Sequence, residues 1–174
     1  MKNPLRHKGG FTLIEMMVVI VIIVIVAGAL LPRLPDVGAA RLKYAARKLG
    51  GTITYVYDRS AATQLTYRLT FDLGANEFYV SRLNRDNQFE ETELAFAKRT
   101  KLPANVRITS AETASQGNVA AGKAVVHCFP GGFADYAVFH LADNGGNEMT
   151  LIVHSLTGRV EALEGYHAAE RNKV

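Results

Sequence analysis

Cysteine and tryptophan are nearly absent from this 174-residue chain, which contains Cys128 and no tryptophan. One cysteine excludes an internal disulfide and every metal or redox site that needs a pair of cysteines. We expect Cys128 to be a small core residue. The chain also lacks the GxSxG, GxxxxGKS/T, GxGxxG and HExxH patterns of common hydrolases, nucleotide-binding proteins and zinc proteases. We therefore expect a protein that is not an enzyme and that holds no cofactor or metal.

Acidic residues are missing from the N-terminus. The first ten residues contain Lys2, Arg6 and Lys8 but no acid, whereas the whole chain has 20 basic and 16 acidic residues and a net charge of +4. Without these ten residues the count becomes 17 basic against 16 acidic residues, a net charge of +1. Nucleic-acid binding depends on clustered cations, so the nearly neutral remainder argues against it.

Long hydrophobic runs are absent, with one exception near the N-terminus. Residues 16–31 carry no polar side chain, and the largely apolar stretch from Phe11 to Leu31 is 21 residues long. A helix of that length spans roughly 30 Å, the thickness of a bilayer core. We predict one membrane-spanning segment, whose basic flank keeps the N-terminus in the cytoplasm and directs the rest of the chain outward.

The carboxylate of Glu15 distinguishes three interpretations of this segment. The first is an ordinary secretory signal peptide, cut near Ala27-Gly28-Ala29, and the second is a plain signal anchor. A carboxylate within a membrane costs about 2.5–3.5 kcal/mol, and neither of these two interpretations gives Glu15 a role that would justify this cost. If the chain is instead cut after Gly10, Phe11 gains a free α-amine one helical turn from Glu15. The amine and the carboxylate then neutralise one another, and between neighbouring copies the pair sets the axial register of packed helices.

Residues 10–15, with the sequence GFTLIE, resemble the class III signal of type IV pilins and type II secretion pseudopilins. The resemblance comprises a basic leader (residues 1–10) that ends in Gly10, a mature N-terminus at Phe11, and a glutamate, Glu15, as the fifth mature residue. Pro32 stands where many of these proteins have a helix-kinking proline. The resemblance implies that a prepilin peptidase cuts after Gly10 and methylates the amine of Phe11. It also implies that Glu15 pairs with the amine of a neighbouring subunit during filament assembly.

Residues 32–63 are predicted to continue the helix with one apolar face. The apolar positions recur at intervals of three and four, and most charged residues lie off this stripe. Gly50-Gly51 weakens the helix by about 1 kcal/mol per glycine and marks a bend or a close-packing point. We expect the stripe to pack on the sheet of its own domain. It consists of Val37, Ala40, Tyr44, Ala45, Leu49, Ile53 and Val56.

From residue 64 onward the period of the apolar residues changes from 3.6 to 2, which predicts strands. We expect a periplasmic antiparallel β domain over residues 64–165 and a flexible tail over residues 166–174. Residues 84–93 and 111–122 are predicted to be loops. The expected fold class is α+β, a type IV pilin-like long N-terminal helix packed on an antiparallel sheet. The predicted strands cover residues 65–73, 77–83, 93–97, 106–110, 123–129, 136–142, 148–155 and 159–163.

Within the pilin-like proteins, the chain is most similar to the minor pseudopilin H group of type II secretion systems (general secretion pathway protein H), to which the FimT-type minor pilins are related. The similarity rests on the long helix, on LTYRLTFDLGANEFYV at residues 65–80 and on LTGRVEAL at residues 156–163. It implies a single-pass inner-membrane protein with a periplasmic domain, which later joins the tip of a pseudopilus that exports folded proteins. The implied partners are other minor pseudopilins, the major pseudopilin, the inner-membrane assembly platform, the prepilin peptidase and the lipid bilayer.

Two alternative functions remain open. The first is a FimT-like minor pilin that binds DNA during uptake, for which Lys98, Arg99 and Lys101 form the densest run of cations. A short run of this kind is more typical of a solvated loop, so we expect no nucleic-acid partner. The second is a soluble β domain that ordinary signal peptidase releases.

Two groups of residues could bind a metal ion. His127, His140 and His154 lie in predicted strands, but separations of 13 and 14 residues do not follow a ligand spacing, and strand histidines are more often packing residues. Residues 143–148, with the sequence DNGGNE, are rich in oxygen ligands and could hold calcium. The same composition is typical of a hairpin turn, because Asn and Gly tolerate a positive φ. We favour the turn.

Overall fold

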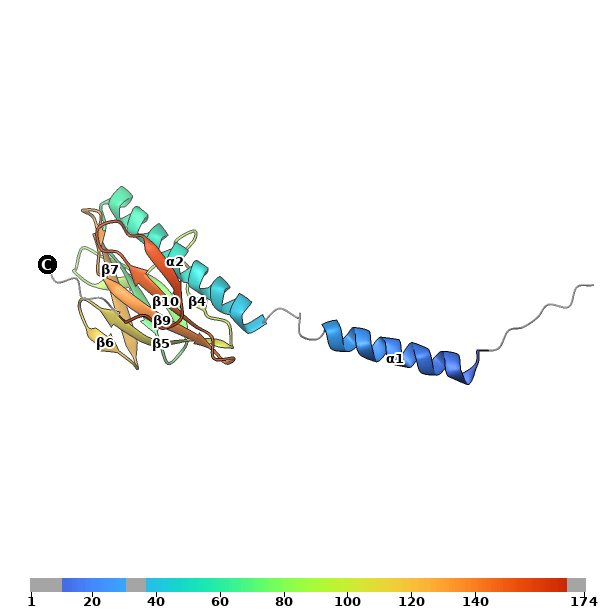
Figure 1. The fold of residues 1–174 in the computed structure, drawn as a ribbon. Coiled ribbons are helices and arrows are strands. Elements are labelled where there is room, and N and C mark those ends of the chain that lie inside the picture. Colours follow the sequence, from blue (N-terminus) through green and yellow to red (C-terminus); the bar gives the residue numbers. More distant parts are fainter. Residues whose placement is uncertain (1–10, 31–36, 169–174) are drawn as a thin grey trace, which may run out of the picture. The chain divides into compact units, whose positions relative to one another are not determined.

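The computed structural model describes residues 11–30 and 37–168. Gly10 and Pro32, the predicted cleavage and kink residues, therefore lie outside the described residues. The chain divides into two compact units, one before and one after the boundary between residues 36 and 37. The N-terminal unit contains helix α1 (Leu13–Leu30), and the C-terminal unit contains helix α2 (Val37–Thr63) and all the strands (Figure 1).

Helix α1 has 18 residues and coincides with the predicted apolar segment. In the ranges that the structure describes, no helix reaches the combined length and apolarity required to cross a membrane.

The apolar stripe predicted for helix α2 is confirmed in its C-terminal part and wrong near its start. Tyr44 is 60% exposed and Ala40 is exposed as well, because the buried face is rotated toward Leu42 and Ala46. The confirmed positions, each 0–1% exposed, are Ala45, Leu49, Ile53 and Val56.

The glycine pair does not interrupt helix α2, which is continuous through Gly50-Gly51. A Cβ at Gly50 would lie 3.3 Å from the side chain of Val160. Gly50 is thus a close-packing point between the helix and a strand.

The strands form two antiparallel sheets rather than one. The first sheet has the order β3-β2-β1-β7-β8, with β4 paired to β2, and the second has the order β11-β10-β9-β5-β6. The first sheet contains β1 (Tyr67–Asp72), β2 (Glu77–Leu83), β3 (Phe89–Glu91), β4 (Thr100–Lys101), β7 (Lys123–Phe129) and β8 (Phe133–Ala134). The second contains β5 (Val106–Thr113), β6 (Gly117–Val119), β9 (Ala137–Asp143), β10 (Glu148–Val153) and β11 (Val160–Glu164).

The two predicted hairpins are confirmed. Strands β1 and β2 pair from Tyr67 opposite Arg82 to Asp72 opposite Glu77, and β9 pairs with β10. Two predicted loops are wrong in part: β3 lies inside residues 84–93, and the end of β5 and all of β6 lie inside residues 111–122. Strands β3 and β6 are short edge strands that bury little surface, so their polar side chains do not alternate. The end of β5 lies inside its sheet and buries Ala111 and Thr113, but this alternation is too short to stand out from the polar residues that follow it. Conversely, residues 93–97 form a single bridge between Leu94 and Ala97 instead of a strand.

Helix α2 and the inner faces of both sheets enclose one hydrophobic core. Figure 1 shows α2 lying along one side of the strands. The sheets meet at Phe71 of β1 and Phe139 of β9, whose ring centroids are 4.4 Å apart. Cys128 is fully buried in this core, as predicted. Its burial raises the pKa of the thiol to about 12, so the thiol is neutral and unreactive at neutral pH.

The outer edge of β7 is closed by side chains instead of a further full strand. The side-chain amide of Gln116 accepts a hydrogen bond from the N–H of Val125 (2.8 Å) and donates one to the carbonyl of Lys123 (3.1 Å). Asp135 accepts a hydrogen bond from the N–H of His127 (3.0 Å). Because these backbone groups already have partners, this edge is protected against pairing with another chain.

Tyr57 holds two loops against the C-terminal half of α2. Its hydroxyl lies 2.6 Å from the carbonyl oxygen of Gly132 and 3.0 Å from that of Leu156. Gly158 crosses the face of the Tyr57 ring with a φ of +61°, and a Cβ there would overlap the ring. A glycine is therefore required at Gly158 for two reasons, the backbone conformation and the close approach to the ring.

We expect Gly158→Ala to lower the free energy of unfolding by about 3 kcal/mol or more, through backbone strain together with the clash against Tyr57. Gly117 is the matched control, because it has a φ of +69° and a Cβ there would meet nothing within 4 Å. Gly117→Ala should cost only the strain, about 1–2 kcal/mol. Urea unfolding of the full chain in a mild detergent, followed by tyrosine fluorescence, measures both. Equal losses would contradict the role of the Tyr57 contact.

Candidate functional site

The first turn of α1 is set by Thr12. Its hydroxyl oxygen accepts a hydrogen bond from the backbone N–H of Glu15 (3.3 Å), and its carbonyl accepts one from the N–H of Met16 (3.3 Å). Thr12 is therefore the N-cap of the helix, and Thr12 with Glu15 has the T-x-x-E spacing of a capping box. Phe11 precedes the helix and is 77% exposed. The capping role of Thr12 was not predicted, although the T-x-x-E spacing is visible in the sequence.

Helix α1 is apolar on every side except at Glu15. From Leu13 to Val26 every large hydrophobic side chain is exposed, with fractions between 42% at Val19 and 88% at Leu13. The carboxylate of Glu15, in the first turn, is exposed as well. A helix that is hydrophobic all round is normally covered by lipid or by other helices. The candidate site at Phe11 and Glu15 therefore places one carboxylate at the start of an apolar helix surface, which is normally covered by lipid or other helices.

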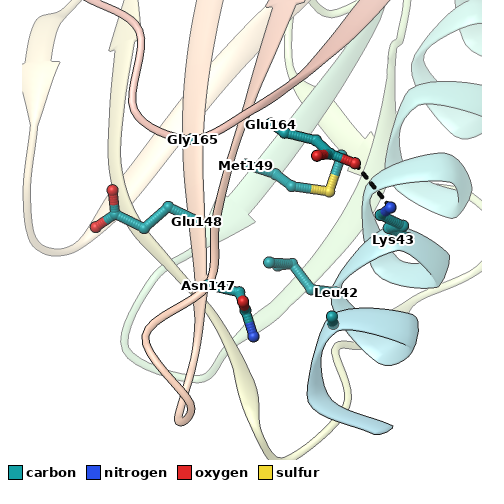
Figure 2. A pocket seen from close by; sticks show the side chains of 8 residues that line it. Leu42, Lys43, Asn147, Glu148, Met149, Glu164 and Gly165 are labelled. Atoms are coloured by element: carbon teal, nitrogen blue, oxygen red, sulfur yellow. Dashed lines mark ion pairs between the residues drawn. The ribbon is translucent and has the colours of Figure 1, made fainter. Parts of the chain in front are cut away.

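An open pocket of about 280 Å³ lies between the start of α2 and the ends of β10 and β11. Leu42 and Met149 contribute apolar atoms, and Lys43 reaches from α2 to Glu164, with 2.7 Å between Nζ and the carboxylate oxygen (Figure 2). This ion pair lowers the pKa of Glu164 below its usual value. Both side chains are well exposed, so the pair adds little stability.

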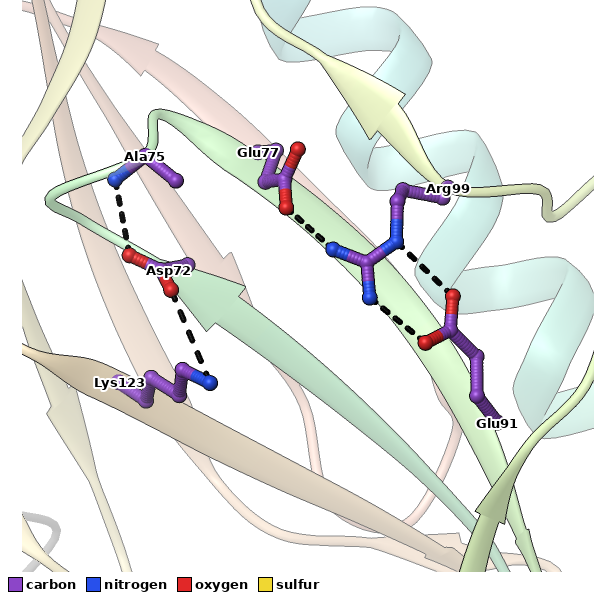
Figure 3. Close-up of polar contacts among 6 residues, drawn as sticks. All are labelled: Asp72, Ala75, Glu77, Glu91, Arg99 and Lys123. Atoms are coloured by element: carbon purple, nitrogen blue, oxygen red, sulfur yellow. Dashed lines mark hydrogen bonds and ion pairs between the residues drawn. The ribbon is translucent and has the colours of Figure 1, made fainter.

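Two of the three cations in the basic run, Lys98 and Arg99, have acidic partners. The guanidinium of Arg99 binds both carboxylate oxygens of Glu91, at 2.9 and 2.6 Å, and also contacts Glu77 (Figure 3). These acids raise the pKa of Arg99, and Arg99 lowers the pKa of Glu91. Lys98 lies 3.7 Å from Glu93. The run that the DNA-binding alternative would use therefore takes part in a charge network that links β2, β3 and the segment before β4.

The structure does not bring the three candidate histidines together. His127 pairs with Asp135 (2.7 Å), His140 lies 3.2 Å from the hydroxyl of Thr150, and His154 lies 3.4 Å from Glu161. Burial lowers the pKa of His140. Within the described part of the chain, no group of three or more histidine, cysteine, aspartate or glutamate residues is arranged to hold a metal ion.

The predicted turn after β9 is confirmed. One carboxylate oxygen of Asp143 accepts hydrogen bonds from the N–H groups of Gly145 (2.8 Å) and Asn147 (2.9 Å), and the other lies 2.9 Å from the side-chain amide of Asn147. These bonds lower the pKa of Asp143. The carboxylate that calcium would need is therefore engaged by the turn itself.

Comparisons with known proteins agree with this arrangement. Residues 5–31 match the family model of the prokaryotic N-terminal methylation motif. No curated protein sequence matches the chain significantly.

Three solved structures share the fold. Two are structures of the minor pseudopilin EpsH from the type II secretion system of Vibrio cholerae, both 9% identical to this chain. One EpsH structure gives a TM-score of 0.61, and the match covers 77% of this chain and 100% of the EpsH chain. The other gives a TM-score of 0.56, and the match covers 71% of this chain and 97% of the EpsH chain. The third is the type IV minor pilin FimU of Pseudomonas aeruginosa, 14% identical, with a TM-score of 0.50 over 72% and 90%. The chain therefore has the type IV pilin-like fold that was predicted, preceded by a methylation motif.

The lowered pKa of Asp143 predicts a pH dependence. A carboxylate with a lowered folded-state pKa contributes stability above its unfolded pKa, near 4, and loses it as the pH falls through the lower folded-state value. Asp143→Asn does not titrate. Urea midpoints should therefore favour the wild type at neutral pH, and the difference should shrink below about pH 4. A difference independent of pH would contradict this role. Added calcium should leave both midpoints unchanged.

Proposed function

We propose that this chain is a minor pseudopilin, a non-enzymatic subunit of the pseudopilus of a type II secretion system. The observation that carries the proposal is the combination, in one chain, of an N-terminal methylation motif with a domain whose fold is that of EpsH. Neither part alone would suffice, since the motif covers residues 5–31 and the domain likeness is one of fold at 9% identity.

In this proposal a prepilin peptidase cuts after Gly10 and methylates the new amine of Phe11. Residues 11–31 then anchor the subunit in the inner membrane, with the β domain in the periplasm, until it joins other minor pseudopilins and the major pseudopilin on the assembly platform. The exposed apolar surface of α1 supports this part, because such a surface is stable only against lipid or other helices. The mature subunit sits at the tip of the filament, where it helps to start assembly.

The carboxylate of Glu15 pairs with the amine of Phe11 in a neighbouring subunit. The geometry at Thr12 supports this role, because the cap of α1 uses the backbone N–H of Glu15 and leaves its carboxylate exposed. Inside an apolar layer the attraction between an ammonium and a carboxylate is stronger than in water. The pair therefore favours one axial register of the packed helices over others.

Two observations bear on the alternatives. The likeness to FimU keeps a minor type IV pilin as the second candidate, and the genes adjacent to this one would distinguish secretion from pilus assembly. DNA uptake through the 98–101 run is disfavoured, because Arg99 is held by Glu77 and Glu91. The methylation motif disfavours release by ordinary signal peptidase, because a chain cut by that enzyme would not use the motif.

The mass of the mature N-terminus tests the processing step. We expect the protein purified from its native membrane to begin at Phe11 and to carry one methyl group on the α-amine. Top-down mass spectrometry measures both features in one experiment. A mature chain that begins at Leu30, after the Ala27-Gly28-Ala29 segment, would refute the filament proposal.

The role of Glu15 is tested by two single variants. Glu15→Ala removes the carboxylate but keeps the N–H that Thr12 caps, so the β domain should fold normally while incorporation into sheared filaments falls at least tenfold. Thr12→Val removes the cap and keeps the carboxylate, at a cost of about 1 kcal/mol to the helix, so incorporation should fall much less. Incorporation is measured by immunoblot of the filament fraction. Normal incorporation of Glu15→Ala would show that the pair is not needed.

A further inference from the structure

The exposed side of the first turns of α2 carries a basic face, formed by Arg41, Tyr44, Arg47 and Lys48. All four side chains are exposed, and Tyr44 is exposed by 60%. Spacings of three, four and seven residues place the side chains on the side of the helix opposite the core-facing Leu49. Tyr44, predicted to lie in the core, belongs instead to this face.

Among the described residues, the cations of the basic face have no acidic partner. Lys43, beside them, pairs with Glu164, but no ion pair is formed by Arg41, Arg47 or Lys48 within residues 11–30 and 37–168. The sequence contains no acid from residue 37 to residue 57. Elsewhere on the domain Arg99 is neutralised by acids. Within the part of the chain that the structure describes, the basic face is therefore a positive surface whose cations form no ion pair.

The basic face is tied to the apolar helix by a short piece of chain. Helix α1 ends at Leu30 and α2 begins at Val37. Seven residue steps of extended chain reach at most roughly 25 Å. If α1 lies in a bilayer, as in the proposed function, Arg41 to Lys48 cannot move far from the lipid headgroups, so their local concentration near that surface is high.

We propose that the basic face docks the periplasmic domain on the anionic headgroups of the bilayer that holds α1. This inference rests on the proposed function, since it needs α1 in the membrane. The Arg and Lys side chains bind lipid phosphates, and the ring of Tyr44 lies among the headgroups, where tyrosine is enriched in membrane proteins. Basic residues near the exported end of a membrane segment work against export. The orientation of the chain in the membrane therefore does not explain these cations, whereas binding to anionic headgroups does.

Each Lys or Arg near an anionic surface favours the bound state roughly fivefold. Three cations together should shift the ratio of docked to undocked domain by about 100-fold. The contact is electrostatic, so salt should weaken it. A subunit that leaves the bilayer for a filament gives up this contact.

The test uses the full chain in lipid nanodiscs. Gly51 is exposed on the same helix, and a Cβ there meets nothing within 4 Å. Gly51→Cys therefore accepts a fluorophore, while the native Cys128, buried and with its pKa raised to about 12, stays unlabelled. Quenching of the fluorophore by a headgroup-attached quencher reports how close the face lies to the lipid.

We expect strong quenching in nanodiscs of equal parts phosphatidylglycerol and phosphatidylcholine, and weak quenching in phosphatidylcholine alone. High salt should remove the difference. The variant with Arg41→Gln, Arg47→Gln and Lys48→Gln should also lose this difference in quenching. The charge-matched control variant, which should keep the difference, removes three exposed cations on other parts of the domain: Arg82→Gln, Arg85→Gln and Arg107→Gln. Thermal melts of both triple variants should match the wild type, which excludes misfolding as the cause.

Two results would overturn the inference. The first is equal quenching in neutral and anionic nanodiscs. The second is a response to added duplex DNA without a response to phosphatidylglycerol, which would assign the basic face to nucleic acid. Flotation of the full chain with neutral vesicles at alkaline pH tests the anchor separately. A chain that does not float refutes the membrane part of the proposed function, and one that floats without headgroup-dependent quenching refutes only the docking.

Discussion

An apolar helix that carries one carboxylate is stable only when it is covered, and this constraint sets what α1 needs from its surroundings. Helix α1 exposes every large side chain from Leu13 to Val26, and none of this surface is needed for the core of the domain. Covering it with lipid or with other helices removes a large unfavourable contact with water. Glu15 is then the one residue of α1 whose position along the helix matters electrostatically, because a charge is costly in such a layer unless it is paired.

The core of the globular domain contains no residue of α1. Helix α2 and two sheets close a core of their own, and Phe71 and Phe139 join the sheets. Side chains supply hydrogen bonds where no strand or helix does. Gln116 and Asp135 accept hydrogen bonds from backbone N–H groups at the edge of β7, and the hydroxyl of Tyr57 binds loop carbonyls next to α2. The core of this domain therefore does not depend on what covers α1. In the docking that we propose, the basic face of α2 rests against an anionic membrane.

Much of the fold could be predicted from periodicity. The period-2 stretches predicted both hairpins, and the stretch rich in Asn and Gly after β9 predicted its turn. The errors have physical reasons. Strands β3 and β6 are short and polar, so they leave no alternation to detect. Tyr44 fits the helical spacing of the core, but the neighbouring strands cover Leu42 and Ala46 instead, which a single-helix pattern cannot reveal.

The sequence by itself predicted the candidate site, because its residues are local: the early cations, Gly10, Phe11 and the carboxylate of Glu15 lie within the first fifteen residues. Their roles in processing and assembly stay predictions. Only the tertiary structure decided what depends on contacts between distant residues. It separated His127, His140 and His154, and it placed Glu77 and Glu91 against Arg99, which neutralises one of the three cations in the 98–101 run. It also left Arg41, Arg47 and Lys48 exposed. Side chains far apart in the chain meet only where strand order and register bring them together, and no local pattern encodes that order.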